Sequence, residues 1–208
     1  MGYQLVKSIN AAAIARFHDD AMSVSGEGPR AGTGFKAVWR KIEEDHRCNV
    51  LLRSERERAQ RHDSRDADRA ARRRRIERYE ALRHHAVAAM DRELLNVLGD
   101  GSRHPGARFH AESAGTLIDR LSLLAIEIHY ARNGSLRSRT SQASLAPAAR
   151  AKLVRLVEQR MEVARALDEL MAGAVLHILY FRAYQPQSER DGGQRIPVEP
   201  GARTMIAG

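Results

Sequence analysis

Apolar residues recur three, four and seven positions apart through most of this chain, and this spacing limits its fold more than any other feature. Such spacing places residues on one face of an α-helix. Alternating β-branched runs, which indicate strands, are scarce, and 43% of the 208 residues are hydrophobic, enough for one sizeable core. The sequence therefore predicts an all-α fold: a single-domain helical bundle of about five helices with a flexible C-terminal tail.

The predicted helices cover about residues 5–22, 35–61, 67–98, 112–133 and 148–184. Asn133 and Gly134 are expected to end the fourth helix, and Pro147 is expected to open the last one. We divide the chain into an N-terminal helix with a Gly-rich loop (1–34), a helical bundle domain (35–184) and a mobile tail rich in Gly and Pro (185–208).

Composition narrows the classes of protein that this chain can belong to. A single cysteine, Cys48, excludes a disulfide framework and a cysteine-rich metal site, and it suits the cytoplasm. No run of about 18 apolar residues occurs, so we expect no membrane span. The net charge of +9, concentrated in the arginines of 71–78, could attract polyanions. Because aromatic residues are only 5% and no reader motif is present, nucleic acid is the least favoured partner.

The segment ESAGTLIDRLSLLAIEIHY, residues 112–130, carries charges on a helix that is apolar on two sides. Its principal apolar face includes Leu117, Leu121 and Ile128. Asp119 and Glu127 lie on the opposite face, which is itself half apolar. A charge withdrawn from water is costly unless it is paired and hydrogen-bonded. These carboxylates therefore need partners from other helices.

Three other predicted helices also direct an ionisable residue toward the core. Arg83 is aligned with the apolar residues of the third helix, with His84 beside it. Arg160 is aligned with those of the last helix, and His46 with those of the second. One interpretation is a structural network in which the arginines pair with Asp119, Glu127 or Asp168. The other is a ligand site, because inward guanidinium groups suit a carboxylate or phosphate.

For the second interpretation the candidate roles follow from side-chain chemistry. Carboxylates can act as general acids or bases, and imidazoles can transfer a proton near neutrality. We expect no organic cofactor and no metal ion, because no motif for either is present. The predicted catalytic residues are Asp119, Glu127, His46 and His84, and the predicted substrate-binding residues are Arg83, Arg160, Arg120, Tyr130 and Glu112.

The sequence also resembles an uncharacterised bacterial family, domain of unknown function 4254. The resemblance extends from Trp39 to about Tyr184, and Glu127 departs from it where the family usually has Lys. It implies an all-α bacterial protein with a small-molecule role, because such genes often accompany sugar-transfer or specialised-metabolite genes. The matching positions are Gly115, the IDRLS run at 118–122, Ile76, Arg83 and Asp91 in the third helix, and Gln159, Arg160, Glu162, Leu167 and Asp168 in the last.

We therefore expect a cytoplasmic enzyme of bacterial biosynthesis, specialised-metabolite (for example antibiotic) or sugar-related, that acts on an anionic small molecule. A lyase, isomerase or hydrolase that works by acid-base chemistry needs no cofactor. The alternatives are a non-catalytic accessory protein that docks a partner enzyme, and a nucleic-acid-associated basic protein. Apolar residues on two faces of the long helices also suggest a homodimer.

Overall fold

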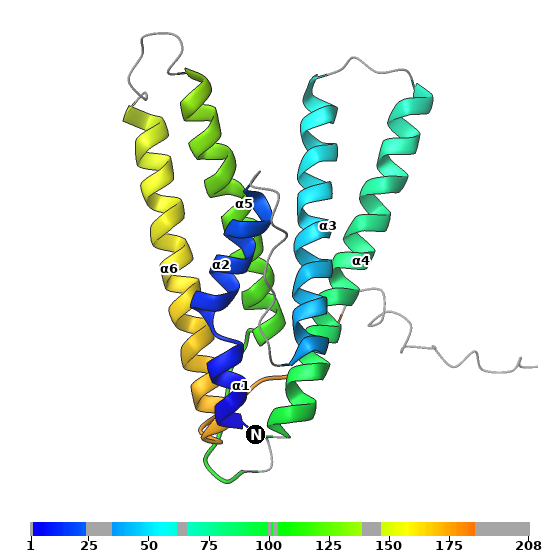
Figure 1. The fold of residues 1–208 in the computed structure, drawn as a ribbon. Coiled ribbons are helices and arrows are strands. Elements are labelled where there is room, and N and C mark those ends of the chain that lie inside the picture. The colour runs from blue at the N-terminus through cyan, green and yellow to red at the C-terminus, as the bar shows by residue number, and fades with distance from the viewer. Residues whose placement is uncertain are drawn as a thin grey trace, which may run out of the picture.

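The computed structural model describes residues 2–23, 35–61, 66–99, 101, 104–138 and 147–185, and it confirms the all-α helical bundle (Figure 1). The Gly-rich loop at 24–34 and the tail from 186 onward lie outside these residues. Two short strands, β1 (Arg108–Phe109) and β2 (Leu179–Tyr180), pair in parallel. The helices are α1 (Gly2–Ser8), α2 (Ala11–Met22), α3 (Lys36–Arg61), α4 (Asp66–Leu98), α5 (Ala114–Ser138) and α6 (Pro147–Val175).

The helices form two long pairs, α3 with α4 and α5 with α6, which are close at one end and diverge toward the other (Figure 1). The short helices α1 and α2 lie against the α5–α6 pair. Helix α5 is the central element, because it contacts α2, α3, α4 and α6. A charged side chain on α5 can therefore meet partners from several helices.

One hydrophobic core joins the N-terminal helices to the long ones. Apolar side chains of α1 and α2 are as buried as those of α3 to α6. The segment 1–34 therefore contributes to the bundle through its helices. Fully buried members of this core include Leu5, Ile14, Phe17, Trp39, Leu94, Leu117, Leu121 and Leu167.

The predicted first helix, 5–22, is wrong in one respect, because the structure breaks it at Asn10. The Asn10 side chain accepts a hydrogen bond from the Ala13 amide at 2.9 Å, which caps the start of α2. Its amide group also donates to the Lys7 carbonyl at 2.9 Å, at the end of α1. A single polar residue thus ends one helix and begins the next.

Two other predicted helix ends are also corrected. Helix α5 continues to Ser138 instead of ending at Asn133. Helix α6 begins at Pro147 as predicted, but it ends at Val175 and not near 184. The chain then turns through His177, which has a positive φ of 57°, and folds back so that Leu179 packs against Gly173. A Cβ atom on Gly173 would lie 2.7 Å from Leu179 Cδ1, so a larger residue at this position would displace the Leu179 side chain.

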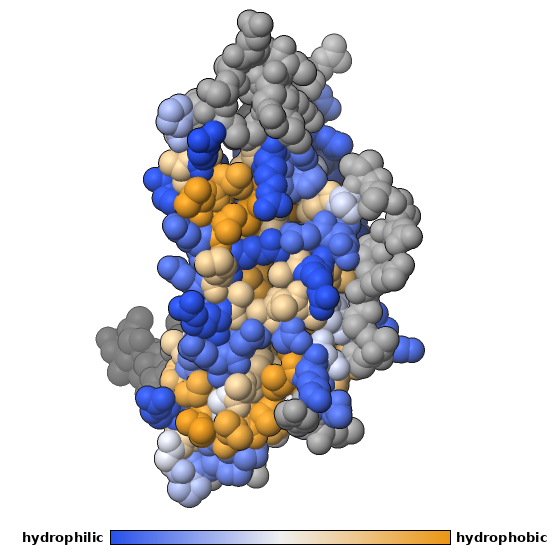
Figure 2. All heavy atoms as spheres, turned by 60° about the vertical axis from the view of Figure 1, so that its left-hand side comes forward, coloured by the Kyte–Doolittle hydropathy of each residue, from blue (hydrophilic) through white to orange (hydrophobic). Residues whose placement is uncertain are grey.

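The surface carries apolar as well as polar residues. Figure 2 shows one side of the molecule with apolar residues in separate groups among hydrophilic ones. Val154 and Met161 on α6, and Leu176 and Ile178 after it, are large apolar residues that are exposed. Within the described ranges no helix is both long and apolar enough to cross a membrane.

Candidate functional site

The close packing of α4 and α5 places Arg83 against Asp119. At Gly115 the helices are so near that a Cβ atom would lie 2.7 Å from the Val87 carbonyl oxygen. One turn along each helix, Arg83 Nε donates to Asp119 Oδ1 at 2.7 Å, and Arg83 Nη2 donates to Oδ2. This bidentate pair is strong, because both partners are charged and Asp119 is only 5% exposed. The Asp119 carboxylate raises the pKa of Arg83.

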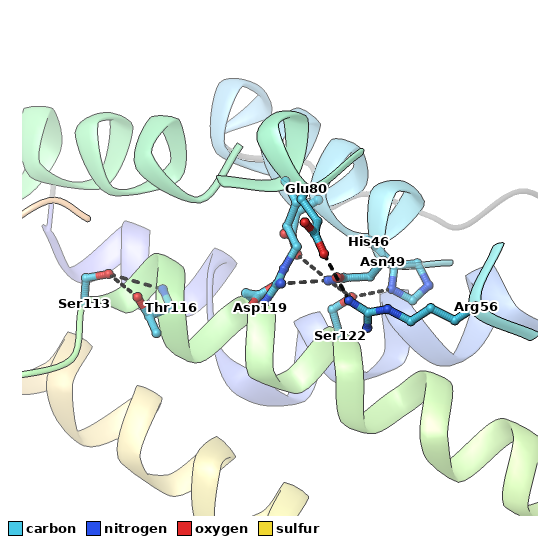
Figure 3. Close-up of polar contacts among 10 residues, drawn as sticks. His46, Asn49, Arg56, Glu80, Ser113, Thr116, Asp119 and Ser122 are labelled. Atoms are coloured by element: carbon cyan, nitrogen blue, oxygen red, sulfur yellow. Dashed lines mark hydrogen bonds and ion pairs between the residues drawn. The ribbon is translucent and has the colours of Figure 1, made fainter. Parts of the chain in front are cut away.

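Helix α3 adds a buried polar network to this pair (Figure 3). Asn49 Nδ2 donates to Asp119 Oδ1 at 2.9 Å and lies 3.1 Å from Ser122 Oγ. Ser122 Oγ in turn lies 2.8 Å from His46 Nδ1. Because Ser122 accepts from Asn49, its hydroxyl can donate to His46. The side chains of three helices are thus joined from Arg83 to His46, and the ones contributed by α3 and α5 are buried.

Asp45 is a second buried carboxyl group beside Asp119. It is fully buried, and Asn49 Nδ2 lies 3.4 Å from its Oδ2 atom. Burial raises the pKa of Asp45 well above its usual value, and the nearby negative charge of Asp119 raises it further. The neutral form of Asp45 is therefore favoured more than that of an exposed aspartate. One carboxyl group of this pair is paired with arginine, whereas Oδ1 of the other has no hydrogen-bond partner among the described residues.

A pair of buried histidines lies at the far side of the network. The rings of His18, on α2, and His46 stack with centroids 4.6 Å apart and planes 19° apart. Burial lowers the pKa of His46 to about 4 and that of His18 well below its usual value, so both rings are neutral at pH 7. Among the described residues, neither nitrogen of His18 nor Nε2 of His46 has a hydrogen-bond partner. Such buried polar atoms are uncommon in proteins.

A pocket of about 240 Å³ opens beside the Arg83–Asp119 pair, between α3 and α5. Arginines from α3 and α4 and glutamates from α3 and α5 give it a strongly charged wall, and Leu123 and Ile126 form an apolar floor. Asn49 connects the pocket to the buried network. The complete lining is Asn49, Leu52, Arg53, Arg56, Glu57, Arg83, Leu123, Ile126 and Glu127.

Ion pairs join the helices around this pocket. Arg53 donates to Glu127 across α3 and α5 and to Glu57 at 3.1 Å. Arg56 donates to Glu80 at 3.2 Å across α3 and α4. The Arg53 guanidinium also lies over the Tyr130 ring, 4.8 Å from its centroid. Since the Arg53, Arg56, Glu127 and Glu80 side chains are all about one third exposed or more, these pairs are weaker than the Arg83–Asp119 pair.

Only some of the residues predicted from the sequence come together here. Arg83 and Glu127 line the pocket, and Asp119 lies directly behind Arg83. Tyr130 contacts the pocket through Arg53. His46 reaches the same network through Ser122. These positions agree with the predicted alignment of inward charges on α3, α4 and α5.

The predicted convergence of two inward arginines is wrong, because Arg160 lies on another side of the bundle. It donates to Asp19 at 2.9 Å and to the Ala15 carbonyl at 2.8 Å, both on α2. Asp168 also contacts α2, because its carboxylate accepts a hydrogen bond from the Ala11 amide at 2.8 Å. On α6 the charges face the short N-terminal helix and not the α3–α5 pocket.

Three further predicted site residues lie away from the pocket. Arg120 and Glu112 form an exposed ion pair of 2.8 Å one helical face away from Asp119. Glu112 lies just before α5 and Arg120 lies two turns later, and both side chains are exposed to solvent. The His84 ring packs beside Tyr184 with centroids 5.8 Å apart and does not line the pocket.

Sequence reasoning missed five residues of this region: His18, Asp45, Asn49, Arg53 and Arg56. Asp45 and Asn49 could have been found, because they share the face of Ile42 and His46 at helical spacing. Arg53 and Arg56 continue the same spacing, at four and seven residues after Asn49, but they lie on a polar stretch where an arginine is usually solvated. His18 is on α2, whose position against α3 is a property of the tertiary fold. In the part of the chain that the structure describes, no three His, Cys, Asp or Glu side chains are placed to hold a metal ion.

Comparison with models of protein families gives a match. A family model described as "Protein of unknown function (DUF4254)" matches residues 39–182. The matched region contains the pocket and the Arg83–Asp119 pair but not His18. No curated protein and no solved structure matches significantly.

Proposed function

This chain belongs to the DUF4254 family, and we propose that it is a small-molecule enzyme of bacterial biosynthesis that binds an anionic substrate in the α3–α5 pocket. The observation that supports this proposal most is the wall formed by Arg53, Arg56 and Arg83. Guanidinium groups bind carboxylate and phosphate through paired hydrogen bonds. The volume of about 240 Å³ suits a small metabolite or the anionic end of a larger one.

Arg53 and Arg56 are the groups that would bind the anion. Arg53 is paired with Glu127 and Glu57, whose side chains are 35% and 24% exposed, and Arg56 is paired with Glu80, which is 40% exposed. Ion pairs near the surface contribute only about 0–1 kcal/mol. A substrate carboxylate or phosphate can therefore replace them at low cost. Arg83 is held by the buried Asp119, so it would contribute a fixed positive charge instead of exchanging partners.

Glu127 is the proposed general acid or base, because it lines the pocket and becomes free when the substrate takes its arginine partner. Asp119 would orient Arg83 and Asn49 toward the substrate. Asp45, whose pKa burial raises, and the neutral His46 lie behind them and would limit the negative charge of the network. Proton transfer of this kind supports an elimination, an isomerisation or a hydrolysis, the cofactor-independent classes expected from the sequence.

A thermal-shift screen against phosphorylated sugars, nucleotide sugars and amino acids tests this proposal. A ligand that binds the folded state raises the melting temperature. We expect an anionic metabolite to stabilise the wild type and the Arg40→Ala control, in which an exposed arginine outside the pocket is removed from the same helix. The same compound should not stabilise Arg53→Ala/Arg56→Ala. Stabilisation that persists in the double variant would place binding elsewhere.

A non-catalytic accessory protein is the second candidate, and the geometry of Asp119 favours it. Both carboxylate oxygens already accept hydrogen bonds, from Arg83 and Asn49, as in a structural clamp between helices. Such a protein would dock a partner enzyme. Asp119→Asn weakens this clamp and lowers the melting temperature under either candidate. Under the enzyme proposal the folded variant also loses turnover, whereas under the accessory proposal the melting temperature alone changes.

The homodimer remains a prediction that accompanies either candidate. Apolar residues such as Val154 and Met161 are exposed on α6 and are available for such a contact. Sedimentation equilibrium of the purified protein tests it directly, since a monomeric mass would exclude the dimer.

A further inference from the structure

The first half of α4 presents arginines that have no partner within the described part of the chain. Arg73, Arg74 and Arg78 are exposed, and no described residue forms an ion pair or hydrogen bond with them. Their neighbour Arg75, in contrast, donates to Glu55 of α3 at 3.1 Å. The unpaired guanidinium groups are therefore available to a ligand from solution.

These three arginines share one face of the helix. At 100° per residue they span an arc of about 140°, and the rise of 1.5 Å per residue places them within about 8 Å along the axis. Figure 1 shows this stretch of α4 at the end where the α3–α4 pair has diverged from α5 and α6. The other residues on the face between 67 and 81 are small or acidic, namely Ala67, Ala70, Glu77 and Ala81.

This face carries an energetic cost in the free protein. Like charges four residues apart, such as Arg74 and Arg78, destabilise a helix by roughly 0.2–0.5 kcal/mol per pair. The carboxylate of Glu77 offsets only part of the positive charge. A polyanion would relieve the repulsion, and the net charge of +9 would attract one from a distance.

We propose that this arginine face of α4 binds the phosphate backbone of nucleic acid without sequence preference. The small alanines allow a backbone to approach closely, and guanidinium groups bind phosphate through paired hydrogen bonds. Between residues 67 and 81 this face has no aromatic or large aliphatic side chain that could enter a lipid bilayer, and the exposed Leu82 lies one turn beyond Arg78 at its edge. The face also lacks the amide side chains that read adenine and the aromatic side chains that stack on bases, and its arginines are assigned to phosphate contacts, which carry no sequence information.

The test is fluorescence anisotropy of a short labelled DNA duplex of mixed sequence, titrated with the full-length protein from about 50 to 200 mM salt. Each phosphate contact contributes about 0.9 to the slope of log K against log salt. The variant Arg73→Ala/Arg74→Ala/Arg78→Ala should therefore lower the slope by about 2.7. The matched control is Arg150→Ala/Lys152→Ala/Arg155→Ala on α6, which removes the same charge from exposed, unpaired positions.

We expect the wild type and the α6 control to bind with similar slopes, and the α4 variant to bind more weakly with a shallower slope. Equal losses in both variants would mean that binding depends only on net charge, which would overturn the proposal. The absence of binding at about 50 mM salt would also overturn it. So would binding to phosphatidylserine vesicles without binding to the duplex. Circular dichroism of both variants verifies that the exposed substitutions leave the helices intact.

Discussion

The two stacked histidines are residues whose protonation is tied to folding. In the unfolded chain a histidine has a pKa near 6.5, whereas burial lowers the pKa of His46 to about 4 and that of His18 in the same direction. The unfolded chain therefore binds more protons below pH 6.5. The stabilisation from these neutral rings is fully present above pH 6.5 and is lost as pH falls toward 4.

We accordingly predict that the free energy of unfolding falls between pH 6.5 and 4, with His46 contributing up to about 3 kcal/mol of the loss. Asp91 opposes this trend, because burial raises its pKa to about 6 and the folded chain therefore binds this proton more readily than the unfolded chain. Its contribution to the free energy of unfolding is present at low pH and is lost as pH rises through 6. In His18→Leu, which cannot take up a proton at this position, the acid-induced loss should be smaller. Urea unfolding across this pH range measures both, and identical pH profiles for the two proteins would contradict the prediction.

The Arg83–Asp119 pair yields a second prediction at this scale. Removing one partner leaves a charge that is mostly buried and unpaired, which costs about 3 kcal/mol in comparable pairs. We expect Arg83→Met and Asp119→Leu each to lower stability by about this amount, and the double variant to lower it by less than the sum. Urea unfolding of the four proteins in a double-mutant cycle measures the coupling. Strictly additive losses would show that the two side chains do not interact.

At the scale of the helices, Asn10 determines where the N-terminal helices meet. It caps α2 through the Ala13 amide, and an N-cap replaced by alanine costs about 1 kcal/mol. We predict that Asn10→Ala lowers the melting temperature by several degrees, while Asn10→Asp, which keeps the accepting oxygen, has a smaller effect. Thermal unfolding by circular dichroism compares them. A larger loss in Asn10→Asp than in Asn10→Ala would contradict the cap.

The sequence was informative about helices and less so about how they meet. Periodicity predicted α3 and α4 and the start of α6, because an apolar stripe is a local pattern. It did not reveal the break at Asn10, whose signal is one polar residue before an alanine run. It also missed the end of α6, since nothing local shows that Leu179 returns to Gly173.

The candidate site shows the same division between local and tertiary information. Helical spacing identified Arg83 and Asp119 as inward residues, and the bidentate pair confirms their proximity. The same spacing also pointed Arg160 inward, but only the tertiary fold shows that α2, and not α4, lies opposite it. The side of a helix on which a charged residue lies can be predicted from sequence. The residue that pairs with it depends on the relative positions of the helices.

At the scale of the whole molecule, three ion pairs border the pocket, and two of them connect the two diverging helix pairs. Arg53–Glu127 joins α3 to α5, Arg56–Glu80 joins α3 to α4, and Arg83–Asp119 joins α4 to α5. Only the last is substantially buried. Substrate binding is therefore expected to exchange the two exposed pairs and to leave the buried one intact, so the bundle can accept a ligand without losing its internal support.

The most direct test of the proposed chemistry is the turnover of Glu127→Gln with the metabolite that stabilises the wild type. The amide keeps the size of the side chain but cannot exchange a proton at neutral pH. We predict that the variant is still stabilised by the metabolite and no longer converts it, as followed by proton NMR of the mixture. Conversion at the wild-type rate would contradict a role for Glu127 in proton transfer and would refute the proposed acid-base mechanism.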